Sequence, residues 1–174
     1  WTPYGYWNYK DKECFFYSCK INGPYYSWAD AMDSSAIFSD NGKGCGNGVV
    51  CTKTYPVRGV CPAGWHLPER SEFEELLAAF GGDGMALLAK GIKTTAQGYV
   101  WPDATNESGF SAITSNYWDG REFRHFNNAY FWTSTETDAS KADKLYLDES
   151  GASFYAYKSG AISIRCVKDA PQGL

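Results

Sequence analysis

Cys61-Pro-Ala-Gly-Trp-His-Leu-Pro68, together with Ile164-Arg-Cys-Val-Lys-Asp169 near the end of the chain, decides how this sequence folds. The first stretch is a turn with aromatic side chains that leads into a helix. The second is a closing strand that carries a cysteine. A disulfide between Cys61 and Cys166 would join the first half of the fold to its last strand, and it predicts an oxidised, extracellular domain with one core.

The chain has six cysteines, an even number that is typical of secreted proteins. They can pair in many ways. We favour three disulfides, which are Cys14–Cys19, Cys45–Cys51 and Cys61–Cys166. The alternative is a zinc site, but no cysteine spacing is C-x-x-C and only His66 and His125 could assist. We therefore expect no metal and no cofactor.

Composition limits the class of protein. The 174 residues suit a single domain over 1–174, and 17% of them are aromatic. Charged residues make up only 21% and the net charge is −4, which argues against nucleic acid as a partner. No apolar run is long enough to cross a bilayer, so no membrane span is expected. No signal-peptide pattern is present at Trp1, which indicates a mature or trimmed fragment.

The first half of the chain predicts two helices separated by a loop. Residues 1–25 form an aromatic N-terminal arm. Ser27 caps a helix that presents Trp28, Ala31 and Met32, with Asp30 completing a capping box, and this helix fades by Phe38. Residues 39–60 are a loop insertion rich in glycine and cysteine.

The second helix has one apolar stripe, and the residues that form it are Phe73, Leu76, Leu77 and Phe80. Ser71 and Glu74 could form its capping box, although the helix could begin as early as Glu69. Gly81-Gly82 ends it. A shorter helical piece is expected over 85–90, and 91–128 is predicted to be mostly loop.

The end of the chain predicts an antiparallel meander with strands at 130–134, 144–149, 152–158 and 161–167. Ser150-Gly151 and Ser159-Gly160 are hairpin signals. Alternation places on the inward face Leu145, Leu147, Phe154, Ala156, Ile162, Ile164 and Cys166. It places on the outward face Tyr146, Asp148, Tyr155, Tyr157, Ser163 and Arg165. Helices early and a sheet late indicate an α+β domain.

Several motifs occur in a fixed order, and they are Tyr26-Ser-Trp-Ala-Asp-Ala-Met32, Cys61 to Pro68, Gly109-Phe-Ser-Ala112, Ala129-Tyr-Phe-Trp-Thr-Ser-Thr-Glu136 and Ile164 to Asp169. Together they resemble the Fibrobacter succinogenes major paralogous domain family over 25–169. The resemblance implies a C-type-lectin-like fold, which is similar to that of formylglycine-generating enzymes, with two helices on a small twisted, mostly antiparallel sheet with long loops. It also implies a bacterial secreted or cell-surface protein.

The sequence contains candidate residues for a general base, a calcium site and a reactive cysteine pair, and each set also has a structural explanation. His66 has no clear polar partner in the sequence, so we expect a hydrogen-bonded structural histidine rather than a general base. His125 reads as a loop contact. Trp101-Pro-Asp103 and Asn106-Glu107 supply oxygens without the spacing of a lectin calcium site. A formylglycine-type oxidase needs a reactive cysteine pair, whereas every cysteine here has a plausible disulfide partner.

Exposed aromatic side chains beside Asp, Asn and Arg suit the binding of sugars, because rings stack on sugar faces and polar groups bind hydroxyls. The predicted ligand-binding residues are Tyr117, Trp118, Asp119, Arg121, Tyr146, Asp148, Tyr155 and Tyr157. We expect a secreted or cell-surface, non-catalytic binding or adhesion domain whose ligand is a polysaccharide or a surface protein. The alternatives are a self-assembling domain of a surface filament or multidomain protein, and an enzyme related to formylglycine-generating enzymes.

Overall fold

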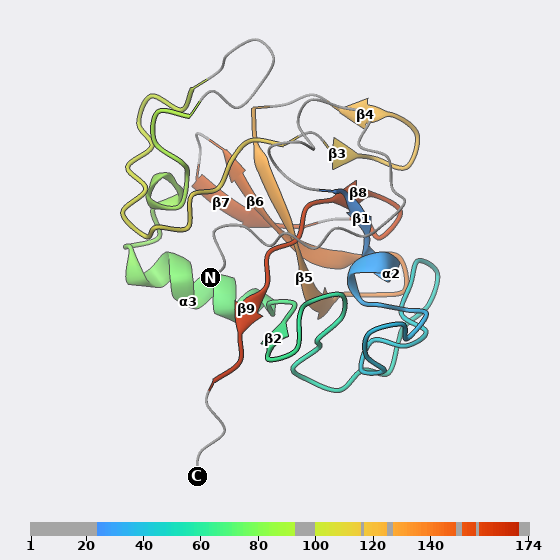
Figure 1. Ribbon diagram of the computed structural model, residues 1–174. Helices are drawn as coiled ribbons and strands as arrows, with labels where there is room; N and C mark the ends of the chain where they lie inside the picture. The colour runs from blue at the N-terminus through green and yellow to red at the C-terminus, as the bar shows by residue number, and fades with distance from the viewer. Residues whose placement is uncertain are drawn as a thin grey trace.

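The structure is a computed structural model that describes residues 24–92, 100–115, 117–124, 127–148, 151–155 and 157–170. Figure 1 shows an α+β arrangement of short helices around small sheets. The helical elements are α2 (Trp28–Ala31), α3 (Arg70–Ala79) and the 3-10 helix η1 (Gly84–Ala86). The strands are β1 (Tyr26–Ser27), β2 (Trp65–His66), β3 (Tyr117–Trp118), β4 (Phe123–Arg124), β5 (Ala129–Glu136), β6 (Ala142–Asp148), β7 (Gly151–Phe154), β8 (Ala161–Ile162) and β9 (Val167–Lys168).

The named strands pair antiparallel in three sheets. One sheet has the order β5-β6-β7, another has the order β1-β8-β3-β4, and β2 pairs with β9 alone. The last two sheets join strands that are distant in sequence. The early and late segments of the described chain are therefore built into the same sheets.

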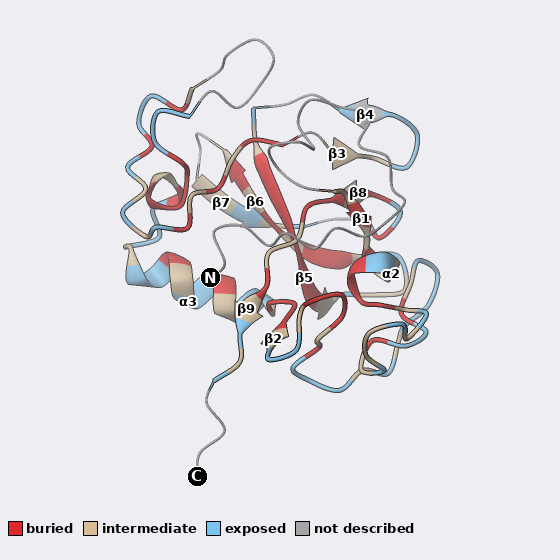
Figure 2. Ribbon diagram, in the orientation of Figure 1, coloured by how far each residue is buried: buried red, intermediate tan, exposed pale blue. Residues whose placement is uncertain are grey.

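The β5-β6-β7 sheet carries apolar residues on both faces. Figure 2 shows that most of β5 is buried. On one face Phe131 and Leu145 pack with Phe73 of α3. On the other face Trp132 packs with Trp28 of α2. Since successive residues of a strand point to opposite faces, β5 serves two clusters at once.

The helix predictions are confirmed in part. Ser27 caps α2 with Asp30 in a capping box, as predicted, but the α-helix ends at Ala31 and is shorter than expected. The Ser71–Glu74 capping box is wrong. The box of α3 is formed by Glu69 and Glu72, because Ser71 already lies inside the helix.

The meander prediction holds for its first three strands only. Leu145 pairs with Phe154 and shares a buried cluster with Leu147, as the alternation predicted. Strands β6 and β7 pair as an antiparallel hairpin with Asp148 opposite Gly151, as predicted, while Ser150 lies outside the described residues. Strand β7 ends at Phe154 rather than at residue 158, and Ala156 lies outside the described residues.

The predicted fourth strand is wrong because 161–167 does not continue the meander. Strand β8 pairs instead with β1 and β3, and β9 pairs with β2. The segment between them changes course, so Ser163 is buried rather than outward and Ile164 is only half-buried. Arg165, also predicted outward, lies over the Phe110 and Phe131 rings, with its carbon Cζ 4.4 and 5.2 Å from their centroids.

Two of the three predicted disulfides are confirmed. Cys45 is bonded to Cys51 and Cys61 to Cys166, with Cα–Cα distances of 4.9 and 5.9 Å. The Cys14–Cys19 prediction and most of the N-terminal arm lie outside the described residues. Within the described part of the chain, no helix is long and apolar enough to cross a membrane.

The 39–60 insertion is anchored to the sheet through a buried ion pair. The Lys158 ammonium donates to Glu136 and to the carbonyl oxygen of Val49 at 2.8 Å. Glu136 also accepts from the backbone N–H of Cys51 at 3.2 Å and from Lys53 at 3.4 Å. Apart from the bond to the Lys53 ammonium, these bonds hold the backbone of the insertion.

Candidate functional site

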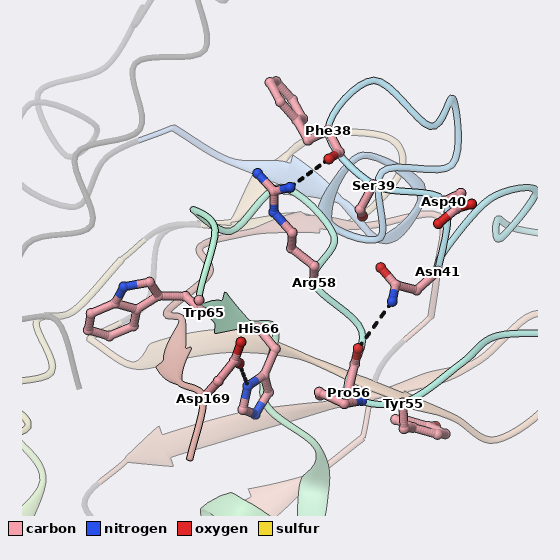
Figure 3. A pocket seen from close by; sticks show the side chains of 11 residues that line it. Phe38, Ser39, Asp40, Asn41, Tyr55, Pro56, Arg58, Trp65, His66 and Asp169 are labelled. Carbon is pink, nitrogen blue, oxygen red and sulfur yellow. Dashed lines mark hydrogen bonds and ion pairs between the residues drawn. The ribbon is translucent and has the colours of Figure 1, made fainter. Parts of the chain in front are cut away.

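A cleft of about 470 Å³ opens between the 39–60 insertion and strand β2 (Figure 3). Its walls come from two segments of the insertion, from the end of the Cys61–Pro68 motif and from the residue that follows β9. The lining residues are Phe38, Ser39, Asp40, Asn41, Tyr55, Pro56, Arg58, Gly64, Trp65, His66 and Asp169.

The β2–β9 pair positions the floor of this cleft. Trp65 lies opposite Lys168 and His66 lies opposite Val167. The backbone N–H of Asp169 donates to the carbonyl oxygen of Gly64 at 3.0 Å, which extends the ladder beyond the strand. The Cys61–Cys166 disulfide closes the same pair of segments just before it. The two motifs that open and close the fold therefore meet at the cleft.

The insertion wall is held by bonds to backbone atoms. Arg58 donates from Nε to the carbonyl oxygen of Cys61 at 2.9 Å and from Nη1 to that of Phe38 at 2.7 Å. The buried Asp33 carboxylate accepts from the backbone N–H groups of 37–39 at 2.6–3.0 Å. Asn41 donates from Nδ2 to the carbonyl oxygen of Pro56 at 3.4 Å.

His66 is held between two carboxylates. Its Nδ1 lies 2.6 Å from an oxygen of Asp169 and its Nε2 lies 2.9 Å from an oxygen of Glu72, while the residue is only 8% exposed. Figure 3 shows the Asp169 contact at the cleft. An imidazole can donate from both nitrogens only when it is protonated, so with both carboxylates ionised this geometry fits the imidazolium.

The two carboxylates and burial act on the His66 pKa in opposite directions. The hydrogen bond with Glu72 raises the pKa most, burial lowers it, and the bond with Asp169 raises it further, so the net direction is upward. Burial would raise the pKa of Glu72, but the bonds from His66 and from the Glu69 backbone outweigh it and lower the pKa. Both shifts favour the charged pair, an imidazolium beside a carboxylate.

No polar partner for His66 was clear from the sequence, and the structure supplies two. The predicted hydrogen bonding of this histidine is confirmed. Asp169 is distant in sequence and reaches His66 through the β2–β9 pairing. The signal that could have located it is the pair of cysteines, since a Cys61–Cys166 bond also draws the residues that follow each cysteine together.

The chemistry of the cleft is aromatic and polar. Tyr55 is 45% exposed, and Phe38 and Trp65 are half-buried. Asp40 is exposed beside them, and the side chains of Asn41 and Asp169 supply amide and carboxylate oxygens. Rings of this kind stack on apolar ligand faces, and the oxygens accept from hydroxyl groups.

The model of the Fibrobacter succinogenes major domain family matches residues 3–168, which is nearly the whole chain and includes the Cys61–Pro68 motif and residues 164–168 of the closing motif. The chain belongs to this family. Comparison of this Fibrobacter succinogenes major domain with curated proteins and with solved structures gave no significant match in either search.

The predicted ligand-binding residues do not line the cleft, and the structure divides them among three places. Asp119 lies in the β3–β4 turn of this Fibrobacter succinogenes major domain. Its carboxylate accepts from the backbone N–H groups of Arg121 at 2.8 Å and Glu122 at 3.0 Å and from Nε of Arg124 at 2.7 Å. The bond from the Glu122 N–H is the largest cause that lowers the Asp119 pKa to about 2. Asp119 thus shapes its own turn.

Tyr117 and Tyr146 belong to a half-buried aromatic cluster around Tyr130. The Tyr130 ring centroid is 4.9 Å from that of Tyr117 and 5.3 Å from that of Tyr146. Lys144 places its ammonium 4.8 Å from the Tyr117 centroid and 4.6 Å from the Tyr130 centroid, and burial lowers its pKa to about 8. This face of the sheet is covered by packing and is not a free outward surface.

Tyr155 and Tyr157 are the exposed aromatic members of the predicted set, and Arg121 in the β3–β4 turn is exposed as well. Each is 54% exposed, and their ring centroids are 5.6 Å apart in an edge contact. The turn that follows them approaches the β3–β4 hairpin closely, since a Cβ on Gly160 would lie 2.9 Å from the carbonyl oxygen of Trp118. This pair, with the half-buried Trp118 nearby, forms a second exposed aromatic surface.

The described residues contain neither a free cysteine nor a cluster of metal-binding side chains. Each of the four cysteines placed there is in a disulfide. Over the same residues, no group of three or more His, Cys, Asp and Glu side chains is arranged to hold a metal ion.

Proposed function

We propose that this domain is a non-catalytic ligand-binding domain of a secreted or cell-surface protein, and that its ligand is a polysaccharide. The observation that carries the proposal is the cleft beside β2, where Tyr55 and Trp65 accompany Asp40, Asn41 and Asp169. Pyranose rings have apolar faces formed by C–H groups and edges that carry hydroxyl groups, so a mixed aromatic and oxygen-rich lining suits them.

The form of the cleft favours binding over acid–base catalysis. Both ring nitrogens of His66 are occupied by carboxylates, so no lone pair of the imidazole is directed at a ligand. The described cysteines are oxidised, which argues against the reactive thiols of a formylglycine-type oxidase.

The scaffold also supports the proposal. Two disulfides in the described chain suit an oxidising compartment such as the cell exterior. Two helices, small antiparallel sheets and a disulfide that closes the fold are the features on which we propose a C-type-lectin-like scaffold. In such a scaffold the loop insertion would present the ligand surface.

Pull-down on cellulose and xylan, together with a glycan array, tests the proposal. We expect Trp65→Ala and Tyr55→Ala to weaken retention about tenfold each, because stacking of an aromatic ring on a ligand ring is worth on the order of 1–2 kcal/mol. The double variant Tyr155→Ala/Tyr157→Ala is the matched control, since it removes exposed rings outside the cleft. Failure of the wild-type domain to bind any glycan would overturn the polysaccharide proposal.

The exposed Tyr155–Tyr157 pair favours a second candidate, a self-assembling domain of a surface filament or multidomain protein. Exposed tyrosines are enriched in protein interfaces. Under this candidate, Tyr155→Ala/Tyr157→Ala would abolish association of the domain in analytical ultracentrifugation while Trp65→Ala would not. A wild-type domain that is monomeric at high concentration would exclude association through this pair.

A further inference from the structure

The His66 side chain joins the cleft to two other parts of the fold by bonds that require two protons. Asp169, which lines the cleft, lies 2.6 Å from Nδ1, and Glu72 on α3 lies 2.9 Å from Nε2. A neutral imidazole has a single N–H. Loss of one proton would leave one carboxylate facing a nitrogen lone pair, and the short contact on that side would become repulsive.

The two carboxylates differ in how firmly they are held. Glu72 also accepts from the backbone N–H of Glu69 at 2.8 Å as part of the α3 capping box. Among the described residues, the Asp169 carboxylate has His66 as its hydrogen-bond partner, and Asp169 follows a strand of only two residues. Asp169 is therefore the side that turns away when the proton is lost.

We infer that the protonated His66 is a positioning residue that fixes Asp169 as a hydroxyl acceptor in the cleft, and that it makes polysaccharide capture depend on pH. This inference rests on the proposed function and names its regulation. At a pH where His66 is protonated, the cleft presents the Asp169 carboxylate in a fixed place. At a pH above this His66 transition, Asp169 is released and the cleft loses an oriented acceptor.

The remaining ionisable groups of the cleft do not compete for His66. Asp40 is exposed on the insertion wall, and Arg58 is committed to two carbonyl oxygens. Burial, with smaller effects of Glu69 and Glu136, raises the pKa of Tyr55, so this phenol stays neutral while His66 titrates. Lys168 on β9 is exposed and lies opposite Trp65.

The direction of the pH effect follows from the upward shift of the His66 pKa. The usual value is 6.5, and the bond with Glu72, opposed by burial and reinforced by Asp169, raises it. The contribution of the bonded imidazolium to stability is complete below 6.5 and is lost as pH rises through the raised value. Release of Asp169 is therefore expected as pH rises above the usual histidine value of 6.5.

The first experiment needs no ligand. NMR titration of the wild type assigns His66 as the signal missing in His66→Gln, and we expect it to titrate above its usual value. Asp169→Asn should lower that value, since it removes a carboxylate. Amide exchange at 167–170, corrected for the intrinsic rate, should quicken above the transition in the wild type and be independent of pH in His66→Gln. A wild-type His66 that titrates at its ordinary value would overturn the inference.

The second experiment measures retention on xylan and cellulose between about pH 6 and pH 9. We expect binding to weaken about tenfold across the transition, the loss typical of one hydrogen bond to a charged group. Asp169→Asn should flatten the profile, and Lys168→Gln, which changes an exposed neighbour, should not. Binding without pH dependence would overturn the positioning role. Absence of binding at every pH would overturn the proposed function, and the titration would still decide the placement of Asp169.

Discussion

Two lysines late in the chain have different partners: Lys158 is paired with a carboxylate, whereas Lys144 lies beside aromatic rings. The Lys158 side chain is fully buried, and its ammonium is bonded to Glu136 and to the carbonyl oxygens of Val49 and Ala139. Lys144 has the rings of Tyr117 and Tyr130 beside its ammonium, and no carboxylate of the described residues lies within ion-pair distance. Burial lowers the pKa of Lys144 to about 8, whereas Lys158 is part of an ion-pair network that anchors a loop.

Lys158→Met is expected to lower the free energy of unfolding by about 3–5 kcal/mol, because it leaves the buried Glu136 carboxylate without its main partner. Urea unfolding followed by tryptophan fluorescence measures the change. Lys141→Met is the matched control, since its ammonium lies 3.8 Å from Asp138 with both side chains well exposed, and it should cost less than about 1 kcal/mol. Equal losses in the two variants would contradict the assignment of Lys158 as an anchor.

At the level of elements, the insertion packs on the short helix α2 through glycines. A Cβ on Gly59 would lie 2.2 Å from the carbonyl oxygen of Ala31, and Gly59 has a φ of 54°. The neighbouring Val60 donates its backbone N–H to the same oxygen at 3.1 Å. The close approach of backbone to backbone is what brings the insertion wall of the cleft to its place.

Gly59→Ala is therefore expected to be strongly destabilising, by about 2 kcal/mol or more beyond the left-handed backbone cost, because the Ala31 carbonyl cannot move aside freely. Gly48→Ala shares the left-handed backbone, at φ 86°, but its Cβ would meet open space, and it should cost only about 1–2 kcal/mol. Thermal unfolding by circular dichroism ranks the two. A Gly48→Ala variant as unstable as Gly59→Ala would show that backbone conformation, and not the contact, decides the effect.

Strand alternation in the sequence predicted the buried face correctly in one late segment and wrongly in another. Alternation located the buried face of β6 at Leu145 and Leu147 because the strand is regular and its face pattern depends on local geometry. The same alternation failed at Ser163 and Arg165, where the chain leaves one sheet for another. Trp132 donates its backbone N–H to the Ser163 carbonyl at 3.0 Å, a long-range bond with no local pattern.

The candidate site was harder to predict than the fold because it depends on long-range contacts that leave no local pattern in the sequence. The exposure that strand alternation predicted for Tyr155 and Tyr157 agrees with the structure, whereas Tyr146 of the same predicted face is half-buried. The cleft depends instead on the meeting of Tyr55, His66 and Asp169, which come from three distant segments. Only the Cys61–Cys166 pairing carried information about that meeting, and it concerned the fold.

For the whole molecule, the Cys61–Cys166 disulfide is the covalent link between the two halves of the described chain. It spans a sequence separation of 105 residues, whereas Cys45–Cys51 spans 6. The β2–β9 pair beside it has only two residues in each strand. The long link therefore supports a small sheet that has few hydrogen bonds of its own, and that sheet carries the floor of the cleft.

Removal of the long disulfide in Cys61→Ala/Cys166→Ala is expected to cost about 4–5 kcal/mol, from the chain entropy restored to the unfolded state. The Cys45–Cys51 disulfide closes a much shorter loop, so its removal in Cys45→Ala/Cys51→Ala should cost less, on the order of 2 kcal/mol. Urea unfolding of both double variants gives the ranking. A larger loss for the short-loop pair would mean that native packing around Cys45, rather than chain entropy, dominates.

The path of the insertion is held by hydrogen bonds to its backbone, so it does not depend on which side chains its outer residues carry. Gly48 donates to the Ala139 carbonyl at 2.7 Å, and Lys158 and Glu136 bond to the main chain at Val49 and Cys51. Ile37, Val49, Val50 and Tyr55 meanwhile point largely into solvent. Replacement of the side chains of Val49, Val50 and Tyr55 one by one is therefore expected to keep the same loop path, so the outer residues of the insertion can vary on a constant frame.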